Sequence, residues 1–296
     1  MKYTLRQLEV FLAAAHHENI TLASKKLAMS QSAASEALKN LENQFTMQLF
    51  DRAGKSLQLN ELGRLVRPQA ESLLVQAREL ESTFSRQAVI GKLKVGATLS
   101  IGNYLAIRIM AKYMSEHPTA KVVLEVANTT TIAGKVRNFL LDIGLIEGEC
   151  NDPELEVIPW RTDELVVFCA ADHPLASKEK LSKVDLVNAH WILRETGSGT
   201  RQTFERAMHG LLPEIDITLE LQHTEAIKRA VEAHLGIGCL SKITLTDAFK
   251  RGNLVPLRVP GRSFTRNFYF ILHKEKYRSS GVKHWIKLCQ QADYLS

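Results

Sequence analysis

Cysteine, proline and long hydrophobic runs are all scarce in this 296-residue sequence. The 4 cysteines form no C-x-x-C motif, and no cysteine–histidine cluster has the spacing of zinc ligands, so we expect neither a metal site nor a disulfide scaffold. With 8 prolines and 16 glycines, the chain is not of low complexity. The simplest interpretation is free and mostly buried thiols, with a redox pair left open, at Cys150, Cys169, Cys239 and Cys289.

Signals for membrane insertion and export are also missing. The sequence has no run of about 18 apolar residues, the length that a transmembrane helix needs. The N-terminal residues reach Glu9 and His16-His17-Glu18 without the apolar run and small-residue cleavage site of a signal peptide. We therefore expect a cytoplasmic protein with no membrane partner.

The net charge of the chain limits the ways in which it can bind an anionic partner. The charge is +6 and the pI about 9.1, within a composition that is 45% hydrophobic and 24% charged, as in soluble globular proteins. Residues 1–90 nevertheless hold 11 Lys/Arg against 9 Asp/Glu, so the first third is not a polycation. Any contact with nucleic acid must come from a shaped surface rather than from a basic tail.

Three regimes follow one another along the chain, whose length suggests two or three domains. Residues 1–60 carry short helical patterns, and residues 61–88 carry one long helical pattern. From Gly91 onward, β-type runs alternate with amphipathic helices, which predicts a layered α/β domain with largely parallel sheets. The strands expected there include 92–97, 121–126, 142–146 and 165–170.

The segment 21–45 predicts two helices joined by a tight turn at Ala28-Met29-Ser30. Ser30 is a good N-cap for the second helix, 31–45. On that helix Ala34, Leu38 and Leu41 gather on one side, with Ala37 and Phe45, while short polar groups and one cation gather opposite. Such a face suits a helix that lies in the DNA major groove, although an ordinary amphipathic surface helix has the same periodicity. The candidate DNA-contacting residues are Ser30, Gln31, Ser32, Ser35, Glu36 and Lys39.

Residues 50–60 predict a short hairpin that turns at Ala53-Gly54-Lys55. Its tip carries Arg52 and Lys55. A hairpin beside a recognition helix forms a wing, which brings cations to the DNA backbone or the minor groove.

These residues resemble the LysR-type transcriptional regulators over positions 4–63. The resemblance rests on Leu5-Arg6-Gln7-Leu8-Glu9-Val10-Phe11, on Thr21-Leu22-Ala23-Ser24-Lys25-Lys26-Leu27, and on Leu49-Phe50-Asp51-Arg52. It extends through Ser30-Gln31-Ser32-Ala33-Ala34-Ser35 and Leu38-Lys39-Asn40-Leu41-Glu42. The sequence departs from the family at Ser32, where proline is frequent, and at Glu36, where a cation is frequent. The resemblance implies a winged helix-turn-helix domain at 1–60 that binds a double-stranded DNA operator.

The pattern at 61–90 predicts a linker helix with a narrow apolar seam. A spacing of 4, 3, 4, 3 and 4 residues indicates a partner helix rather than packing within one domain. The resemblance implies a homodimer, and favours a homotetramer, with RNA polymerase as a further candidate partner. The seam consists of Val66, Ala70, Leu73, Ala77, Leu80 and Phe84.

Residues 91–296 have the size of a periplasmic-binding-protein-like, two-lobed effector domain. We expect the chain to cross between lobes near 160–163 and 263–266. Lobe one then comprises 91–161 and 267–296, and lobe two comprises 162–266. Ligands of open α/β sheets bind at carboxyl strand ends and helix N-termini.

Three hydroxyl-rich helix starts are expected to meet in that cleft. They begin at Thr98 with Ser100, at Asn128 with Thr129, and within 195–201 with Thr200. Free N–H groups and hydroxyls at helix starts bind anions, although serine and threonine also serve as ordinary N-caps. Glu147 follows another apolar run. Its carboxylate repels an anion unless the ligand is protonated or a cation such as Arg194 intervenes.

Further motifs between 98 and 241 resemble a sulfur- and sulfite-responsive branch of the family. They include 100–104, 142–148, 191–201, 224–228 with Thr224, and 236–241. This resemblance implies a small oxyanion effector such as sulfite, and no other cofactor. The candidate effector-binding residues are Thr98, Ser100, Thr129, Glu147, Arg194, Thr200 and Thr224.

Two other classes of protein are alternatives to a ligand-responsive regulator. A metabolic α/β enzyme would need a nucleophile, metal or cofactor constellation, and spacing assigns none. A solute-binding protein for transport would need an export signal and would not carry residues 1–60. We therefore expect no enzymatic activity.

Overall fold

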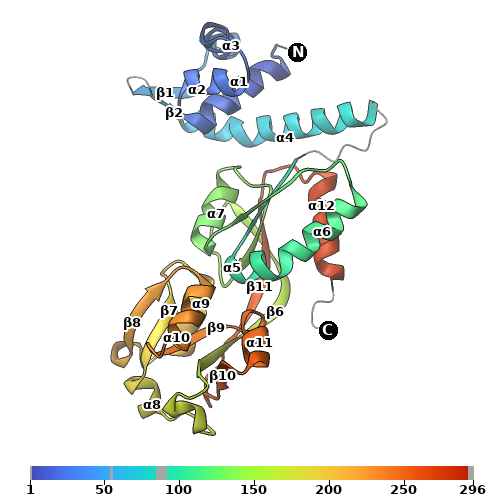
Figure 1. Ribbon diagram of the computed structural model, residues 1–296. Helices are drawn as coiled ribbons and strands as arrows, with labels where there is room; N and C mark the ends of the chain where they lie inside the picture. The colour runs from blue at the N-terminus through green and yellow to red at the C-terminus, as the bar shows by residue number, and fades with distance from the viewer. Residues whose placement is uncertain (1, 54–55, 85–91, 293–296) are drawn as a thin grey trace. The chain divides into compact units, whose positions relative to one another are not determined.

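The computed structural model describes residues 2–53, 56–84 and 92–292. The chain divides into two compact units (Figure 1). The first unit comprises Met1–Gly91 with Glu275–Gly281, and the second comprises Lys92–Lys274 with Val282–Ser296. Each unit buries hydrophobic cores of its own.

The first unit is a winged helix-turn-helix followed by a long helix. Polar side chains cap its helices locally: Thr4 forms a capping box with Gln7, and Asn19 accepts hydrogen bonds from the first turn of the second helix. The helices, hairpin and start of the long helix share one core. Its elements are α1 (Leu5–His17), α2 (Ile20–Lys26), α3 (Gln31–Gln44), β1 (Phe50–Ala53), β2 (Ser56–Leu59) and α4 (Glu61–Phe84).

The second unit contains a mixed sheet in the order β4-β3-β5-β11-β6-β9-β7-β8, with β10 paired to β6. Its strands are β3 (Leu93–Ala97), β4 (Val122–Val126), β5 (Ile143–Glu147), β6 (Leu155–Ala170), β7 (His190–Arg194), β8 (Asp216–Leu221), β9 (Ile237–Ser241), β10 (Leu254–Leu257) and β11 (Thr265–His273). Its helices are α5 (Leu99–Ile101), η1 (Gly102–Ala106), α6 (Ile107–Glu116), α7 (Thr129–Arg137), η2 (Pro174–Ser177), α8 (Lys183–Asn188), α9 (Gly199–Ala207), η3 (Leu212–Glu214), α10 (Thr224–Glu232), α11 (Lys242–Arg251) and α12 (Ser280–Gln291).

Two long strands, β6 and β11, run between two lobes of this unit (Figure 1). Residues 155–164 of β6 pair with β11, while residues 165–170 pair with β9 and β10. Lobe one holds β3–β5 with α5–α7 and α12, and lobe two holds β7–β10 with α8–α11. Within each lobe the sheet has parallel pairs, but every pairing of β6 and of β11 is antiparallel. The expectation of a largely parallel sheet is therefore wrong for β6 and β11, the strands that connect the lobes. The chain passes from one lobe to the other along β6 and returns along the neighbouring β11, so the two strands are antiparallel.

Lobe two carries helices on both faces of its strands. Neighbouring residues of β7 point to opposite faces: Trp191 and Leu193 pack with Phe204 of α9, whereas Ile192 packs with Ile227 of α10. This two-sided burial explains the nearly continuous apolar sequence of the strand. Across residues 2–53, 56–84 and 92–292, no helix combines the length and apolarity needed to cross a membrane.

Candidate functional site

Helix α3 has the two faces that its sequence predicts. The Ser30 hydroxyl accepts a hydrogen bond from Ala33 N at 3.1 Å and caps the helix. Ala34, Leu38 and Leu41 are buried in the core of the unit. The opposite face exposes Gln31, Ser32, Glu36 and Lys39, with Ser35 half-buried. Phe45 departs from the prediction, because its exposed fraction is 42% and it directly follows the helix.

The predicted wing is present as the antiparallel pair β1–β2. Arg52 lies on β1 opposite Leu57. Lys55 lies outside the described residues. The hairpin follows α3 in the chain and packs against α1 and α4. In a winged helix-turn-helix, such a hairpin brings cations to the DNA backbone.

Only part of the predicted seam on α4 is free for a partner. Ala70 and Val66 pack with Leu74 against the core of their own unit. The exposed members of the seam are Leu73, Leu80 and Phe84, with exposed fractions of 40%, 56% and 78%, and Ala77 is half-buried. The stripe available to a second copy therefore starts later than expected, at Leu73.

The hydroxyl-rich helix starts of the second unit meet around the carboxylate of Glu147, at the end of β5. Ser100 N donates to Glu147 Oε1 at 2.8 Å, and Ile101 N lies 3.4 Å from the same oxygen. The Thr200 hydroxyl of lobe two donates to Glu147 Oε2 at 3.2 Å. Glu147 is 1% exposed. The donors expected for a ligand anion are thus directed at an anionic side chain of the protein itself.

Arg266 neutralises this carboxylate directly. Its Nη1 lies 2.7 Å from Glu147 Oε2, and its Nε lies 2.7 Å from Asp163 Oδ2. Arg266 and Asp163 face each other across the antiparallel strands β11 and β6, so the pair forms where the two crossing strands meet. The Ser241 hydroxyl also donates to Asp163, at 2.8 Å. One guanidinium therefore bridges two buried carboxylates.

The two carboxyl groups respond to burial differently. Burial alone would raise the pKa of Glu147, but the charges of Arg266 and Arg194 hold that pKa below its usual range. Burial raises the pKa of Asp163, against the opposing effects of Arg266 and Ser241, and the nearby Glu147 charge adds to the rise. Glu147 is therefore ionised at neutral pH, whereas Asp163 retains a proton to a higher pH than an ordinary aspartate does.

The glycine-rich loop after β7 fits closely against Glu147. A Cβ added at Gly199 would lie 1.9 Å from the Glu147 backbone oxygen, so only glycine allows this approach. Ser198 caps α9 and accepts from Thr200 N at 3.2 Å, while Asn128 caps α7. Because the capping is done by these neighbours, the hydroxyls of Thr129 and Thr200 are available for the Glu147 backbone oxygen and carboxylate.

Arg194, which the sequence suggested as the cation that lets an anion bind near Glu147, pairs with another carboxylate. It forms a bidentate pair with the adjacent Glu195, with Nε to Oε2 at 2.7 Å and Nη2 to Oε1 at 2.9 Å. Its positive charge still lowers the pKa of Glu147, but without direct contact. The direct cation, Arg266, was missed because it lies 119 positions further along the chain, within the predicted lobe crossing.

Two buried threonine hydroxyls of the second unit, those of Thr98 and Thr224, lack ordinary hydrogen-bond partners among the described residues. Thr224, at the start of α10, is 3% exposed, and its hydroxyl has no hydrogen-bond partner among the described residues. The Thr98 hydroxyl lies beside Glu147 and helps to lower its pKa without reaching ordinary hydrogen-bond geometry. A buried hydroxyl without a partner carries a desolvation cost that a polar ligand relieves.

The start of α10 also reaches lobe one through charged and aromatic groups. Tyr104 donates to Glu225 Oε1 at 2.9 Å, and the buried Lys228 Nζ donates to the Tyr104 hydroxyl at 3.3 Å and to Thr244 O at 3.1 Å. Lys228 is 7% exposed. Sequence reasoning assigned no role to Tyr104 or Lys228, because only the fold brings them together.

A pocket of about 240 Å³ opens beside the Glu147 cluster. It is lined by residues of both lobes, among them Thr129 and Thr130 of α7 and Gly197, Ser198 and Arg201 of lobe two. A larger pocket, about 860 Å³, lies in lobe two between α8 and α9, and none of the predicted effector residues lines it.

The four cysteines show no sign of heightened reactivity. All are free; Cys169, Cys239 and Cys289 are buried and Cys150 is half-buried. Burial raises the pKa of Cys169 to about 11, and it also raises the pKa of the other three thiols. Since the thiolate is the reactive form, these thiols are poor nucleophiles at neutral pH.

The comparisons with known proteins agree with this architecture. Residues 5–64 match the family description "Bacterial regulatory helix-turn-helix protein, lysR family", and residues 86–293 match "LysR substrate binding domain". The chain belongs to the lysR family of bacterial regulators. It is a DNA-binding regulator with an effector-binding domain and not an enzyme.

Similar proteins and solved structures cover either nearly the whole chain or its second unit. The uncharacterized HTH-type transcriptional regulator YeiE of Escherichia coli (strain K12) is 41% identical over 293 residues, 99% of both proteins. A single-residue variant of full-length OxyR from Pseudomonas aeruginosa has a TM-score of 0.74 at 20% identity, covering 98% of this chain and 96% of that one. The regulatory domain of CcmR from Synechocystis PCC6803, in complex with 2-PG, has a TM-score of 0.63 at 27% identity, covering 68% and 96%.

Proposed function

We propose that this lysR-family regulator binds operator DNA as a homo-oligomer, with a response set by a small oxyanion held between the lobes of its second unit. The observation that carries the proposal is the buried cluster around Glu147. There, hydroxyls and N–H groups from three helix starts converge with a buried arginine. A further buried hydroxyl, that of Thr224 at the start of α10, has no partner among the described residues.

The proposed DNA contacts lie on the exposed face of α3 and on the wing. Gln31, Ser32 and Lys39 are exposed, and Ser35 lies between them on the same face. Short polar side chains and a cation can reach base edges and phosphates when the helix lies in the major groove. The position of Arg52 on the β1–β2 hairpin supports a contact with the DNA backbone.

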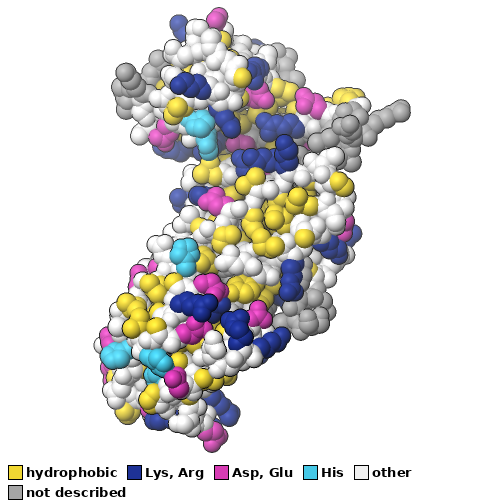
Figure 2. Space-filling view, in the orientation of Figure 1, with side chains coloured by type: hydrophobic (Ala, Val, Ile, Leu, Met, Phe, Trp, Pro, Cys, Tyr) yellow, Lys and Arg dark blue, Asp and Glu magenta, His cyan; other side chains and the backbone are white. Residues whose placement is uncertain are grey.

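Two apolar surfaces support self-association. One is the α4 stripe from Leu73 to Phe84. The other surrounds α6 in the second unit, where Figure 2 shows hydrophobic side chains gathered on the visible face. Ile107 and Met114 of α6 are 47% and 44% exposed, and β4, at the edge of the sheet, exposes Val123 and Val126. One self-complementary surface makes a dimer and two make a tetramer, the assembly that we propose.

A small oxyanion suits the chemistry of the inter-lobe cluster. The ligand would accept hydrogen bonds from hydroxyls such as those of Thr98, Ser100 and Thr224, with Arg266 and Lys228 balancing its charge. The ionised Glu147 carboxylate accepts hydrogen bonds from the donors that an anionic ligand would use. A ligand that still carries a proton can donate it to Glu147, whereas a fully deprotonated one meets repulsion.

These properties favour sulfite over sulfate. Sulfite is still partly protonated near neutral pH, and sulfate has no proton to share with a carboxylate. The sequence motifs that resemble the sulfur- and sulfite-responsive branch support the same choice. The CcmR regulatory domain, whose structure contains 2-PG, shows that a related domain holds a small molecule.

The proposal is tested by calorimetric titration of the full chain with sulfite and with sulfate at two pH values. We expect sulfite to bind more tightly and its affinity to fall as pH rises and the ligand loses its proton. Thr224→Val removes one unpaired hydroxyl at constant shape, so sulfite affinity should drop roughly 5–150-fold, the equivalent of about 1–3 kcal/mol.

The matched control is Thr246→Val. This exposed threonine hydroxyl donates only to Lys242 O within its own helix, at 3.1 Å, so sulfite affinity should not change. Equal affinity for sulfite and sulfate would remove the role of Glu147 in selecting the ligand. Tight binding that is unaltered in Thr224→Val would move the site away from the inter-lobe cluster.

A further inference from the structure

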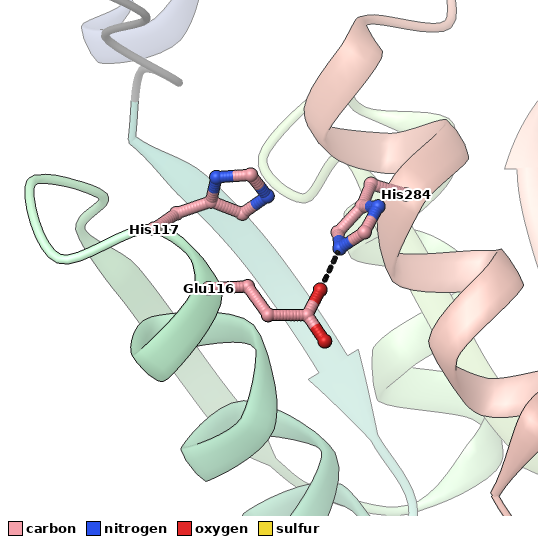
Figure 3. A group of neighbouring side chains, drawn as sticks. All are labelled: Glu116, His117 and His284. Carbon is pink, nitrogen blue, oxygen red and sulfur yellow. Dashed lines mark hydrogen bonds and ion pairs between the residues drawn. The ribbon is translucent and has the colours of Figure 1, made fainter.

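Two histidines and a glutamate meet between α6 and α12, in lobe one. Glu116 ends α6, His117 follows it directly, and His284 lies on α12 (Figure 3). One ligand atom from each residue lies within 4.8 Å of the other two. His284 Nε2 is 2.7 Å from Glu116 Oε2. The group is separate from the Glu147 cluster, and none of its members lines either pocket described above.

The hydrogen bond between His284 and Glu116 does not involve His117, the third member. His117 Nε2 is buried and has no hydrogen-bond partner among the described residues. In Figure 3 the His117 ring points toward His284, and the ring centroids are 4.8 Å apart at an angle of 80°. A buried ring nitrogen without a partner is costly, so it needs either a hydrogen-bond partner or, when unprotonated, a Lewis acid in front of it.

We infer that Glu116, His117 and His284 bind a divalent transition-metal ion, best fitted by Zn²⁺. Two imidazoles and one carboxylate are a ligand set that Zn²⁺ accepts in tetrahedral geometry. With metal–ligand bonds of about 2.0–2.1 Å, tetrahedral ligand atoms lie roughly 3.3 Å apart. On metal binding, the contact between His284 and Glu116 would widen slightly and His117 would move closer.

The surroundings restrict the two histidine ligands and leave room for a fourth metal ligand. The Tyr113 ring packs against His117 and His284 at centroid distances of 5.2 and 5.7 Å, which restricts the orientation of both imidazoles. The side chains of Glu116 and His284 are 38% and 28% exposed, so water can reach the remaining position. The bound ion would link the end of α6 to α12, which lie side by side (Figure 1).

The test uses the full chain, freed of metal by a chelator and then titrated with Zn²⁺ in a calorimeter. We expect one strong site per chain and a rise in melting temperature. With Co²⁺ as a probe, visible absorption bands of tetrahedral cobalt should appear and saturate at the same stoichiometry. Loss of an outer-sphere partner alone weakens metal sites by about 10–100-fold, so loss of a ligand in His117→Gln should cost at least about tenfold.

Two controls separate this site from other histidines. His190→Gln removes an exposed histidine that pairs with Asp216, and it should leave Zn²⁺ affinity unchanged. The adjacent rings of His16 and His17 offer a competing site, tested by replacing both with glutamine. The inference is overturned if the wild-type chain binds no Zn²⁺, if His117→Gln retains full affinity with a native circular dichroism spectrum, or if binding is lost in the His16/His17 variant.

Discussion

Replacing either member of the buried Glu147–Arg266 pair should destabilise the second unit, and by unequal amounts. Both side chains are 1% exposed, and their charged atoms lie 2.7 Å apart. Removing one partner of a buried ion pair costs about 3–5 kcal/mol, because the remaining charge stays buried without compensation. Glu147→Gln leaves Arg266 paired with Asp163, so its cost should fall near the lower end. Arg266→Met leaves two buried carboxylates unpaired and should cost the most.

The matched control for this prediction is Glu149→Gln, two positions further along. Glu149 pairs with Arg206 at 2.8 Å, but the two side chains are 53% and 50% exposed. Exposed ion pairs contribute about 0–1 kcal/mol, so this variant should unfold close to the wild type. The experiment thus compares the same chemical change in a buried and in an exposed ion pair.

Urea unfolding followed by tryptophan fluorescence measures these differences. All 3 tryptophans, Trp160, Trp191 and Trp285, belong to the second unit, so the signal reports that unit without mixing in the first. A cost for Glu147→Gln equal to or above that of Arg266→Met would refute the argument that Asp163 retains its cation. A cost comparable to that of Glu149→Gln would refute the claim that burial makes the pair important.

The pH dependence of the same variants has a defined sign. The folded-state pKa of Glu147 is lowered below the ordinary glutamate value of 4.5, so its stabilising contribution is fully present above that value. The contribution is lost as pH falls through the folded-state pKa. The stability difference between the wild type and Glu147→Gln should therefore be constant near neutral pH and shrink in acid.

Three further predictions concern DNA binding and assembly. Lys39→Ala should weaken binding to a site selected from random DNA by roughly 1–3 kcal/mol in a gel-shift titration at fixed salt, whereas Lys250→Ala, on α11, should not. Arg52→Ala should weaken binding to all sequences alike and lower the salt slope by about one, and an unchanged slope would argue against a phosphate contact. Leu73→Glu with Leu80→Glu should shift sedimentation toward monomers, because each places a charge in the exposed stripe of α4; an intact oligomer would place the interface elsewhere.

The first unit was predictable because its signals are local. The Ser30 cap and the apolar spacing of Ala34 and Leu38 place α3 within one residue of its observed end. The seam of α4 was harder, since periodicity shows that Val66 and Leu73 are apolar but not which core each one meets. The tertiary fold decides that question: Val66 packs within its own unit and Leu73 remains exposed.

The inter-lobe cluster was only half predictable, for a different reason. Helix starts carry a local signature, so Thr98, Thr129 and Thr200 could be placed near Glu147 from sequence alone. The cation could not be placed from sequence, because Arg266 reaches the cluster through the pairing of β6 and β11, which are far apart in the chain. The same limit applies to the proposed metal site, where 168 positions separate Glu116 from His284 and no spacing rule connects them.

The Glu147 carboxylate already accepts the hydrogen bonds that an anionic ligand would need, and this limits how a ligand can act. Thr200 and Glu147 belong to different lobes, and their hydrogen bond joins the two lobes directly. A ligand that binds this arrangement and a more open one equally well shifts nothing, however tightly it binds. An oxyanion that takes the Thr200 or Arg266 hydrogen bonds competes with Glu147, so its binding free energy must differ between the two arrangements. That difference is the source of a regulatory response, and removing the Glu147 charge should reduce it even where the ligand still binds.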